Sequence, residues 1–315
     1  MKASPKKSPL HAVRQKKVKS YDGTSIGYQV IGDGDRVIVL CNGLGGSAIA
    51  WKPLYDSFGD RYKFISWDYR GLFRSDPPQD EAKLTIQDHT ADLDAVLKKE
   101  GVREALIAGW SMGVQVCLEY YRQNAAVFAG IFLLNGTYGY PFDTALNNPL
   151  SRYILPKVNE LAQKIVPAVQ PTLKPIANRL IDWKGFIGLI SKLGLVHENL
   201  DSEIFQEVAR EMMSADLEMY HKIMKHLAEH DAEGVLATIK VPTLIIAGDD
   251  DMITPVRVAE KMAADISKAE LFIVPCGTHY SLLEFPEILT LRVEKFLDDH
   301  YPSTEPAQKK LKSAG

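Results

Sequence analysis

Gly109-Trp110-Ser111-Met112-Gly113 is a G-x-S-x-G motif that lies between the apolar residues 105–108 and a helix-like stretch at residues 111–123. Where a strand turns sharply into a helix, this motif presents its serine as a nucleophile at the edge of a sheet. A motif this short also occurs by chance, because glycine and serine are common residues. Its interpretation therefore depends on the strands and loops that surround it.

Apolar runs and helix-like stretches alternate on both sides of the motif. The predicted strands cover residues 18–21, 25–31, 37–41, 64–67, 105–108, 129–134, 241–247 and 271–274, and the first two form a hairpin around Asp22-Gly23. The predicted helices cover residues 85–99, 111–123, 256–264 and 286–298, and Thr85 with Asp88 forms a capping box at the start of the first. Short, wholly apolar strands indicate an α/β fold with a mostly parallel central sheet and helices on both faces.

The alternation stops for about a hundred residues between two of these strands. Residues 138–234 show no strand pattern, prolines recur from Pro141 to Pro175, and helical periodicity returns over residues 203–230. We therefore expect an inserted helical cap at residues 138–234 and an α/β core at residues 18–137 and 235–300. Residues 1–17 are predicted to be a basic disordered tail, and residues 301–315 a flexible C-terminal tail.

Two later loops supply what a serine nucleophile needs. A serine hydroxyl reacts poorly unless a base lies within hydrogen-bond reach and a third group holds that base. Gly248-Asp249-Asp250-Asp251 follows one predicted buried strand, and Gly277-Thr278-His279 follows the next. The chain order Ser, Asp, His is the order of the α/β-hydrolase triad.

Over residues 18–300 the chain resembles capped serine hydrolases of the α/β-hydrolase fold. The family motif G-x-x-D-x-x-x-P implies that Asp251 is the acid, with Pro255 in its place and Asp249 and Asp250 as alternatives. The family histidine precedes a helix with glutamate and proline, and His279 is followed by Glu284-Phe285-Pro286. The resemblance implies an α/β-hydrolase fold in which Ser111 is the nucleophile and His279 the general base.

The resemblance also implies an oxyanion hole formed by the backbone N–H groups of Met112 and Leu44, with Gly43 and Trp110 beside the substrate. Leu44 lies in the loop Asn42-Gly43-Leu44-Gly45-Gly46. Two positions depart from the family. Asn42 replaces the usual histidine, and Phe73 replaces a glycine in the stretch Asp68-Tyr69-Arg70-Gly71-Leu72-Phe73-Arg74-Ser75. Both departures concern loop geometry rather than the bond-breaking groups.

The amino-acid composition limits the cellular compartments and the classes of partner to be expected for this protein. The 315 residues are 46% hydrophobic and 24% charged, and a net charge of -3 without a nucleic-acid motif argues against a nucleic-acid partner. Three cysteines are too few for a disulfide framework, and neither a targeting segment nor an apolar run of about 20 residues is present. These features favour a cytoplasmic protein. Residues 1–19 hold seven basic and no acidic residues, so peripheral membrane contact is an open alternative.

The predicted cap has opposite charges in its two halves. Residues 150–197 carry a net charge of +5, and residues 198–233 a net charge of -7. We expect the two halves to pack against each other. The alternative is that apolar residues interleaved with lysines enter a lipid interface; these are Trp183, Phe186, Ile187, Leu189 and Ile190.

The sequence predicts a serine hydrolase that cleaves a carboxylic ester, preferably a lipophilic one, through an acyl-enzyme. Such a reaction needs no cofactor. A metal site is not expected either, because His226 and His230 stand four residues apart without a matching carboxylate motif. Three alternatives stay open: an acyltransferase, a carbon–carbon bond hydrolase on the same triad, and a ligand receptor with vestigial turnover. The oligomeric state is left open. An epoxide hydrolase or dehalogenase is disfavoured, because those relatives carry an aspartate where Ser111 stands.

Overall fold

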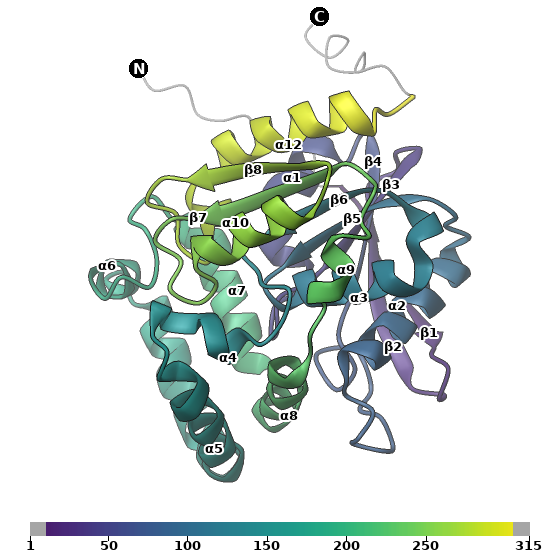
Figure 1. Cartoon of the computed structure of the whole chain (residues 1–315). Helices are drawn as coiled ribbons and strands as arrows, with labels where there is room; N and C mark the ends of the chain where they lie inside the picture. Colours follow the sequence, from purple (N-terminus) through teal and green to yellow (C-terminus); the bar gives the residue numbers. More distant parts are fainter. Residues whose placement is uncertain (1–10, 305–315) are drawn as a thin grey trace, which may run out of the picture.

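An eight-stranded sheet forms the centre of the molecule in the computed structural model, which describes residues 11–304 (Figure 1). Its strands are β1 (Val13–Lys19), β2 (Ser25–Ile31), β3 (Arg36–Cys41), β4 (Tyr62–Trp67), β5 (Ala105–Trp110), β6 (Phe128–Leu134), β7 (Thr243–Gly248) and β8 (Ala269–Val274). They lie in the order β1-β2-β4-β3-β5-β6-β7-β8. The pairs β1–β2 and β2–β4 are antiparallel and the other neighbours are parallel, which confirms the predicted mostly parallel sheet.

Helices cover both faces of the sheet, as predicted. One face carries α1 (Lys52–Phe58) and α12 (Pro286–His300), and the other carries α2 (Ile86–Glu100), α3 (Met112–Asn124) and α10 (Val256–Asp265). Side chains of β3 alternate between the two layers. Ile38 and Leu40 join the cluster under α1 and α12, whereas Val39 and Cys41 join the opposite one. This alternation follows from the two-residue period of a strand and explains why the central strands are apolar throughout.

The helices between β6 and β7 gather at one side of the sheet, away from α12 (Figure 1). They are α4 (Pro141–Thr144), α5 (Ser151–Asp182), α6 (Phe186–Lys192), α7 (Ser202–Ser214) and α8 (Leu217–Glu229), and the short α9 (Glu233–Leu236) leads back to the sheet. The longest, α5, contains Pro156, Pro167, Pro171 and Pro175. Because proline removes a helical hydrogen bond, the sequence did not predict a helix over the residues of α5. It predicted a regular helix in this insertion only over residues 203–230.

The ordered core is longer at both ends than the sequence predicted. β1 begins at Val13 rather than at residue 18, and it pairs with β2 along its whole length. Its side chains are mostly exposed, because it is the edge strand, so a search for apolar residues misses it. Tyr301, expected in a flexible tail, is buried, and the Val37 N–H donates a hydrogen bond to its hydroxyl. Residues 1–10 and 305–315 of the two tails lie outside the described residues.

The two halves of the predicted cap do pack together, but not mainly through their opposite charges. Among the described residues, Arg210 to Asp182 is the one ion pair between the halves, and it joins a base of the acidic half to an acid of the basic half. Amide side chains of α5 instead donate to backbone carbonyls of the other half. In the described range 11–304, no helix is both long and apolar enough to cross a bilayer.

His89 on α2 gives the fold a pH dependence. Its ring is fully buried, and neither ring nitrogen has a hydrogen-bond partner. Burial, with a smaller effect from the charge of Arg70, lowers the pKa of His89 from 6.5 to about 3. The unfolded chain takes up this proton near pH 6.5 and the folded chain only near pH 3. The contribution of neutral His89 to the stability of the fold is therefore fully present above pH 6.5 and is lost as the pH falls toward 3.

We expect His89→Phe to remove this contribution. The difference in free energy of unfolding, variant minus wild type, should be about 2 kcal/mol larger at pH 5 than at pH 7.5. The reason is that the wild type alone loses about 1.4 kcal/mol for each pH unit below about 6.5. Urea unfolding at both pH values measures the change. The same difference between variant and wild type at pH 7.5 and pH 5 would contradict this assignment.

Candidate active site

Ser111 stands at the sharp turn between β5 and α3, at the carboxyl end of a central strand. Its backbone has φ 56° and ψ -120°, which is strained for a residue with a side chain. The turn needs glycine at position 113, because a Cβ there would lie 1.9 Å from the Cys41 carbonyl oxygen. Close packing of α3 against the end of β3 thus holds the serine hydroxyl out at the sheet edge.

The three predicted residues come together in space. The Ser111 Oγ lies 2.9 Å from His279 Nε2, and His279 Nδ1 lies 2.8 Å from Asp251 Oδ2. His279 and Asp251 are buried, with 7% and 3% of their surface exposed. If the serine hydroxyl donates to Nε2, then Nδ1 carries the proton and donates to Asp251. This arrangement can take a proton from Ser111 and stabilise the imidazolium that results.

Asp251 is held as a carboxylate in spite of its burial. Burial alone would raise the pKa of Asp251, but the charge of His279 and hydrogen bonds from His279 and Thr254 outweigh it and lower this pKa below its usual value. Asp251 Oδ1 accepts from the Ile253 and Thr254 N–H groups, and Oδ2 accepts from the Thr254 hydroxyl. The alternatives Asp249 and Asp250 are exposed and line a separate hollow away from Ser111.

Asn135 completes this network and was missed by sequence reasoning. It follows β6, the strand beside β5, and its Nδ2 donates to Asp251 Oδ2 at 3.0 Å and to the Thr278 carbonyl at 3.1 Å. The Ser281 hydroxyl donates to its Oδ1. The signal in the sequence was the Asn135-Gly136 pair at a strand end, which is equally typical of an ordinary turn.

Glu284 anchors the loop that carries His279. It accepts hydrogen bonds from the N–H and hydroxyl of Thr278 at 2.8 and 2.6 Å, and from the His197 N–H at 2.8 Å. Trp110 holds the same loop from the other side, since its Nε1 donates to the His279 carbonyl at 3.1 Å. The sequence left Trp110 open between packing and substrate contact. The structure shows that it packs on the loop and also lines the cavity.

The loop after β3 faces Ser111 across a tight turn. The Gly46 N–H donates to the Gly43 carbonyl at 3.0 Å, and Gly45 has φ +73°, a conformation that suits glycine. A Cβ at Gly43 would lie 2.9 Å from the Trp110 ring and 3.3 Å from the Ser111 Cβ, so glycine lets the loop come this close without displacing Trp110. Leu44, inside this turn, and Met112, the first residue of α3, both line the cavity beside Ser111. The N–H of a first helical residue has no partner within its helix.

The two departures from the family pattern are now explained locally. Asn42 points away from the cavity and links buried groups: its Nδ2 donates to the Ser66 hydroxyl and the Trp67 carbonyl, and its Oδ1 accepts from Trp51. Phe73 adopts a φ of 51°, the left-handed conformation that the family's glycine would take without strain. Both residues thus maintain loops around the site.

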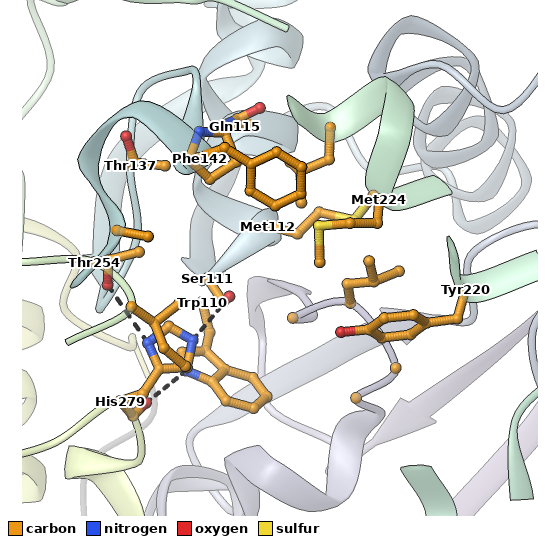
Figure 2. Close-up of a pocket in the computed structure, with 18 of the residues that line it drawn as sticks. Trp110, Ser111, Met112, Gln115, Thr137, Phe142, Tyr220, Met224, Thr254 and His279 are labelled. Atoms are coloured by element: carbon orange, nitrogen blue, oxygen red, sulfur yellow. Dashed lines mark hydrogen bonds between the residues drawn. The ribbon is translucent and has the colours of Figure 1, made fainter. Parts of the chain in front are cut away.

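A cavity of about 320 Å³ opens beside Ser111 and His279 (Figure 2). Side chains from the inserted helices form much of its wall together with the loop after β3. Its apolar lining includes Phe142, Leu155, Val208, Met212, Met224 and Leu227. The volume falls in the range of small-molecule sites, and the lining favours an apolar ligand.

Gln115 is the polar exception in this wall. Figure 2 shows it beside Thr137 and Phe142, one helical turn beyond Ser111 on α3. Its Oε1 lies 2.9 Å from His230 Nδ1, and His230 Nε2 lies 3.1 Å from Glu119. Its Nε2 is buried without a partner. An unpaired buried amide donor costs free energy, which a ligand with an acceptor oxygen would recover.

The lesser candidates lie outside this arrangement. His230, expected on a solvated helix, is buried against Gln115 and Glu119. Within residues 11–304, no group of three or more histidine, cysteine or acidic residues is placed to hold a metal. Cys276, expected to pack at a strand end, is exposed, whereas Cys117 is buried as predicted. Arg70 is buried and binds Asp92 and Asp22, so it holds its own loop.

Comparison with known proteins identifies the family and supports the fold. Residues 38–290 match a family described as "Alpha/beta hydrolase family". The chain is 25% identical over 276 residues to the putative carbamate hydrolase RutD of Caulobacter segnis, covering 84% of this chain and 92% of that protein. It is 24% identical over 302 residues to protein ABHD8 of Bos taurus, covering 92% of this chain and 61% of that protein. This chain therefore spans about three fifths of the length of that relative.

Among solved structures, the fold is similar to that of the esterase EaEST from Exiguobacterium antarcticum. The TM-score is 0.74 at 18% identity, and the match covers 90% of this chain and all of that one. At this identity the likeness establishes the fold.

Proposed function

Because this chain belongs to the alpha/beta hydrolase family, we propose that it is a serine hydrolase that cleaves a lipophilic carboxylic ester through an acyl-enzyme. One observation carries the proposal: His279 bridges Ser111 and Asp251 within hydrogen-bond distance at the wall of an apolar cavity. Three free cysteines also support the cytoplasm as its compartment.

The reaction follows from the positions of these groups. Ser111 Oγ attacks the ester carbonyl carbon while its proton moves to His279 Nε2, and Asp251 stabilises the imidazolium. The N–H groups of Leu44 and Met112 bind the oxyanion, and each such donor is worth about 3 kcal/mol in the transition state. The intermediate collapses as Nε2 returns the proton to the leaving alcohol. Water, deprotonated by His279, then releases the acid and regenerates Ser111.

The apolar cavity supports a preference for longer acyl chains. On p-nitrophenyl esters, we expect kcat/KM to rise about three- to fourfold for each added methylene until the cavity is filled, since burying a methylene is worth about 0.8 kcal/mol. Met224→Trp should shorten the optimal chain, whereas Ile288→Trp, at an exposed position on α12, should leave it unchanged. Equal kcat/KM for acetate and octanoate esters would count against a lipophilic substrate.

Gln115 supports a finer specificity. We expect Gln115→Leu to lower kcat/KM for an ester whose chain carries an oxygen acceptor by about tenfold, and to spare the plain alkyl ester of equal length. A substrate panel with the two ester types measures the ratio. An equal loss on both would show that Gln115 only maintains the fold of the site.

One panel of substrates also separates the ester hydrolase from an acyltransferase and from a ligand receptor. Repeated turnover with water supports the hydrolase, and acceleration by an added alcohol or thiol supports an acyltransferase. A single labelling event without turnover supports a receptor. The panel includes a carbamate, because the name of the Caulobacter segnis relative refers to that bond.

A further inference from the structure

Helix α5 turns several amide side chains toward the protein. The amides of Asn159 and Gln163 donate to the His221 carbonyl on α8 at 3.2 and 3.1 Å. Farther along, Gln170 donates to the Ala215 carbonyl, next to α7, at 2.9 Å. Helices on globular proteins normally bury the apolar stripe and expose the polar one, so these three inward-facing amides are unusual.

Apolar side chains occupy the opposite side of the same helix. Ile154, Val158, Leu161, Ile165 and Ile176 follow helical spacing and are between 47% and 60% exposed. Trp183, just after the helix, continues this row and is 54% exposed. These six residues form the outer face of α5. A row of exposed apolar side chains along one side of a helix is typical of an interaction site.

Charge indicates what covers the outer face of α5. Lys157, Lys164 and Arg179 are exposed on the same helix, and Lys184 follows it. The surrounding residues 150–197 carry a net charge of +5. Their two acids are already paired, Glu160 with Lys164 and Asp182 with Arg210. An apolar face bordered by basic residues is complementary to a bilayer with anionic headgroups.

The position of α5 connects this surface with the cavity. Leu155, next to Ile154 on the helix, lines the cavity beside Ser111. Figure 1 shows α5 at the margin of the molecule, far from α12. The apolar residues that the sequence singled out on α6 are less available, since Phe186, Ile187 and Ile190 pack on the core.

We propose that the outer face of α5 docks in the interface of an anionic lipid bilayer and brings the mouth of the cavity to lipid esters. The second part rests on the proposed ester hydrolysis, and the first does not. The helix lies along the surface, with its lysines and arginine at the headgroups and its apolar row among the acyl chains.

Vesicle co-sedimentation of the full chain tests the docking. We expect binding to phosphatidylglycerol vesicles, weak binding to phosphatidylcholine vesicles, and weaker binding at high salt. The variant Val158→Gln/Leu161→Gln should bind at least tenfold more weakly. The matched control Ile288→Gln/Leu291→Gln changes two equally exposed residues on α12 and should bind like the wild type.

Tryptophan fluorescence gives an independent readout of the same contact. Trp51, Trp67 and Trp110 are buried, so a blue shift on adding vesicles reports on Trp183. Quenching by brominated lipids should accompany the shift. Equal vesicle binding by both double variants, or equal binding to both lipids, would overturn the proposal. So would light scattering that shows a dimer which only Val158→Gln/Leu161→Gln dissociates, because the outer face would then bind a second copy.

Two controls separate docking from catalysis. Val158→Gln/Leu161→Gln should hydrolyse p-nitrophenyl acetate in solution at the wild-type rate, because neither residue lines the cavity. Ser111→Ala should bind vesicles like the wild type. If the wild type binds vesicles but cleaves no ester, the proposed function fails and the docking stands.

Discussion

We expect Ser111→Ala to lower kcat for ester hydrolysis by on the order of 10⁶. Alanine offers no oxygen to form the acyl-enzyme, and His279 Nε2, 2.9 Å from the Ser111 Oγ in the wild type, loses the proton it would accept. The oxyanion donors remain, so a small rate above the uncatalysed reaction should persist. Turnover of p-nitrophenyl butyrate measures the loss, and thermal unfolding checks that the variant folds.

A fluorophosphonate probe makes the same prediction visible without turnover. Intact-mass spectra of the wild type should show one adduct, at Ser111, and those of Ser111→Ala should show none. Ser57→Ala is the matched control, since Ser57 lies on α1 and its hydroxyl donates only to the Pro53 carbonyl. An adduct that persists in Ser111→Ala would place the nucleophile elsewhere.

The second large effect concerns the acid. We expect Asp251→Asn to lower kcat by on the order of 10⁴ with little change in fold, as for other triads in which the carboxylate becomes an amide. An amide nitrogen facing Nδ1 favours the tautomer with its proton on Nε2, and this form cannot take the proton of Ser111. The variant therefore tests whether the base needs the 2.8 Å contact between His279 and Asp251.

Asp250→Asn is the control for this assignment. Asp250 is exposed and does not line the cavity beside Ser111, so kcat should stay within about twofold of the wild type. Turnover of p-nitrophenyl butyrate by both variants decides between the neighbouring aspartates. A large loss in Asp250→Asn together with a small one in Asp251→Asn would reverse the assignment.

Much of the core was predictable because its signals are local. Helix α2 begins and ends close to where the sequence placed it. Thr85 and Asp88 form the capping box at its start, and Gly101, in the left-handed conformation, ends it. The apolar strands β3 to β7 were found because burial on both faces leaves little room for polar residues. The edge strand β1 was partly missed for the converse reason, since its side chains face solvent.

The inserted helices were less predictable. Each proline disfavours a helix at its own position, yet α5 continues through Pro167, Pro171 and Pro175. Packing against α7 and α8 supplies the free energy that local propensity lacks. Of the outer face of α5, the sequence singled out only Trp183, because a helical apolar period does not say which side of the helix faces the protein.

The linear chain was sufficient to single out Ser111, Asp251 and His279 as a candidate triad, because each lies in a short motif at the end of a predicted strand. It was not sufficient to bring in Asn135 or Gln115, which belong to no such motif. Ser111 and His279 are 168 positions apart, and Asn135 and Asp251 are 116 apart. Their contacts arise because β5, β6, β7 and β8 lie side by side and are parallel, so their carboxyl ends meet at one edge. Motifs are local in sequence, whereas proximity between distant residues depends on strand order in the folded sheet.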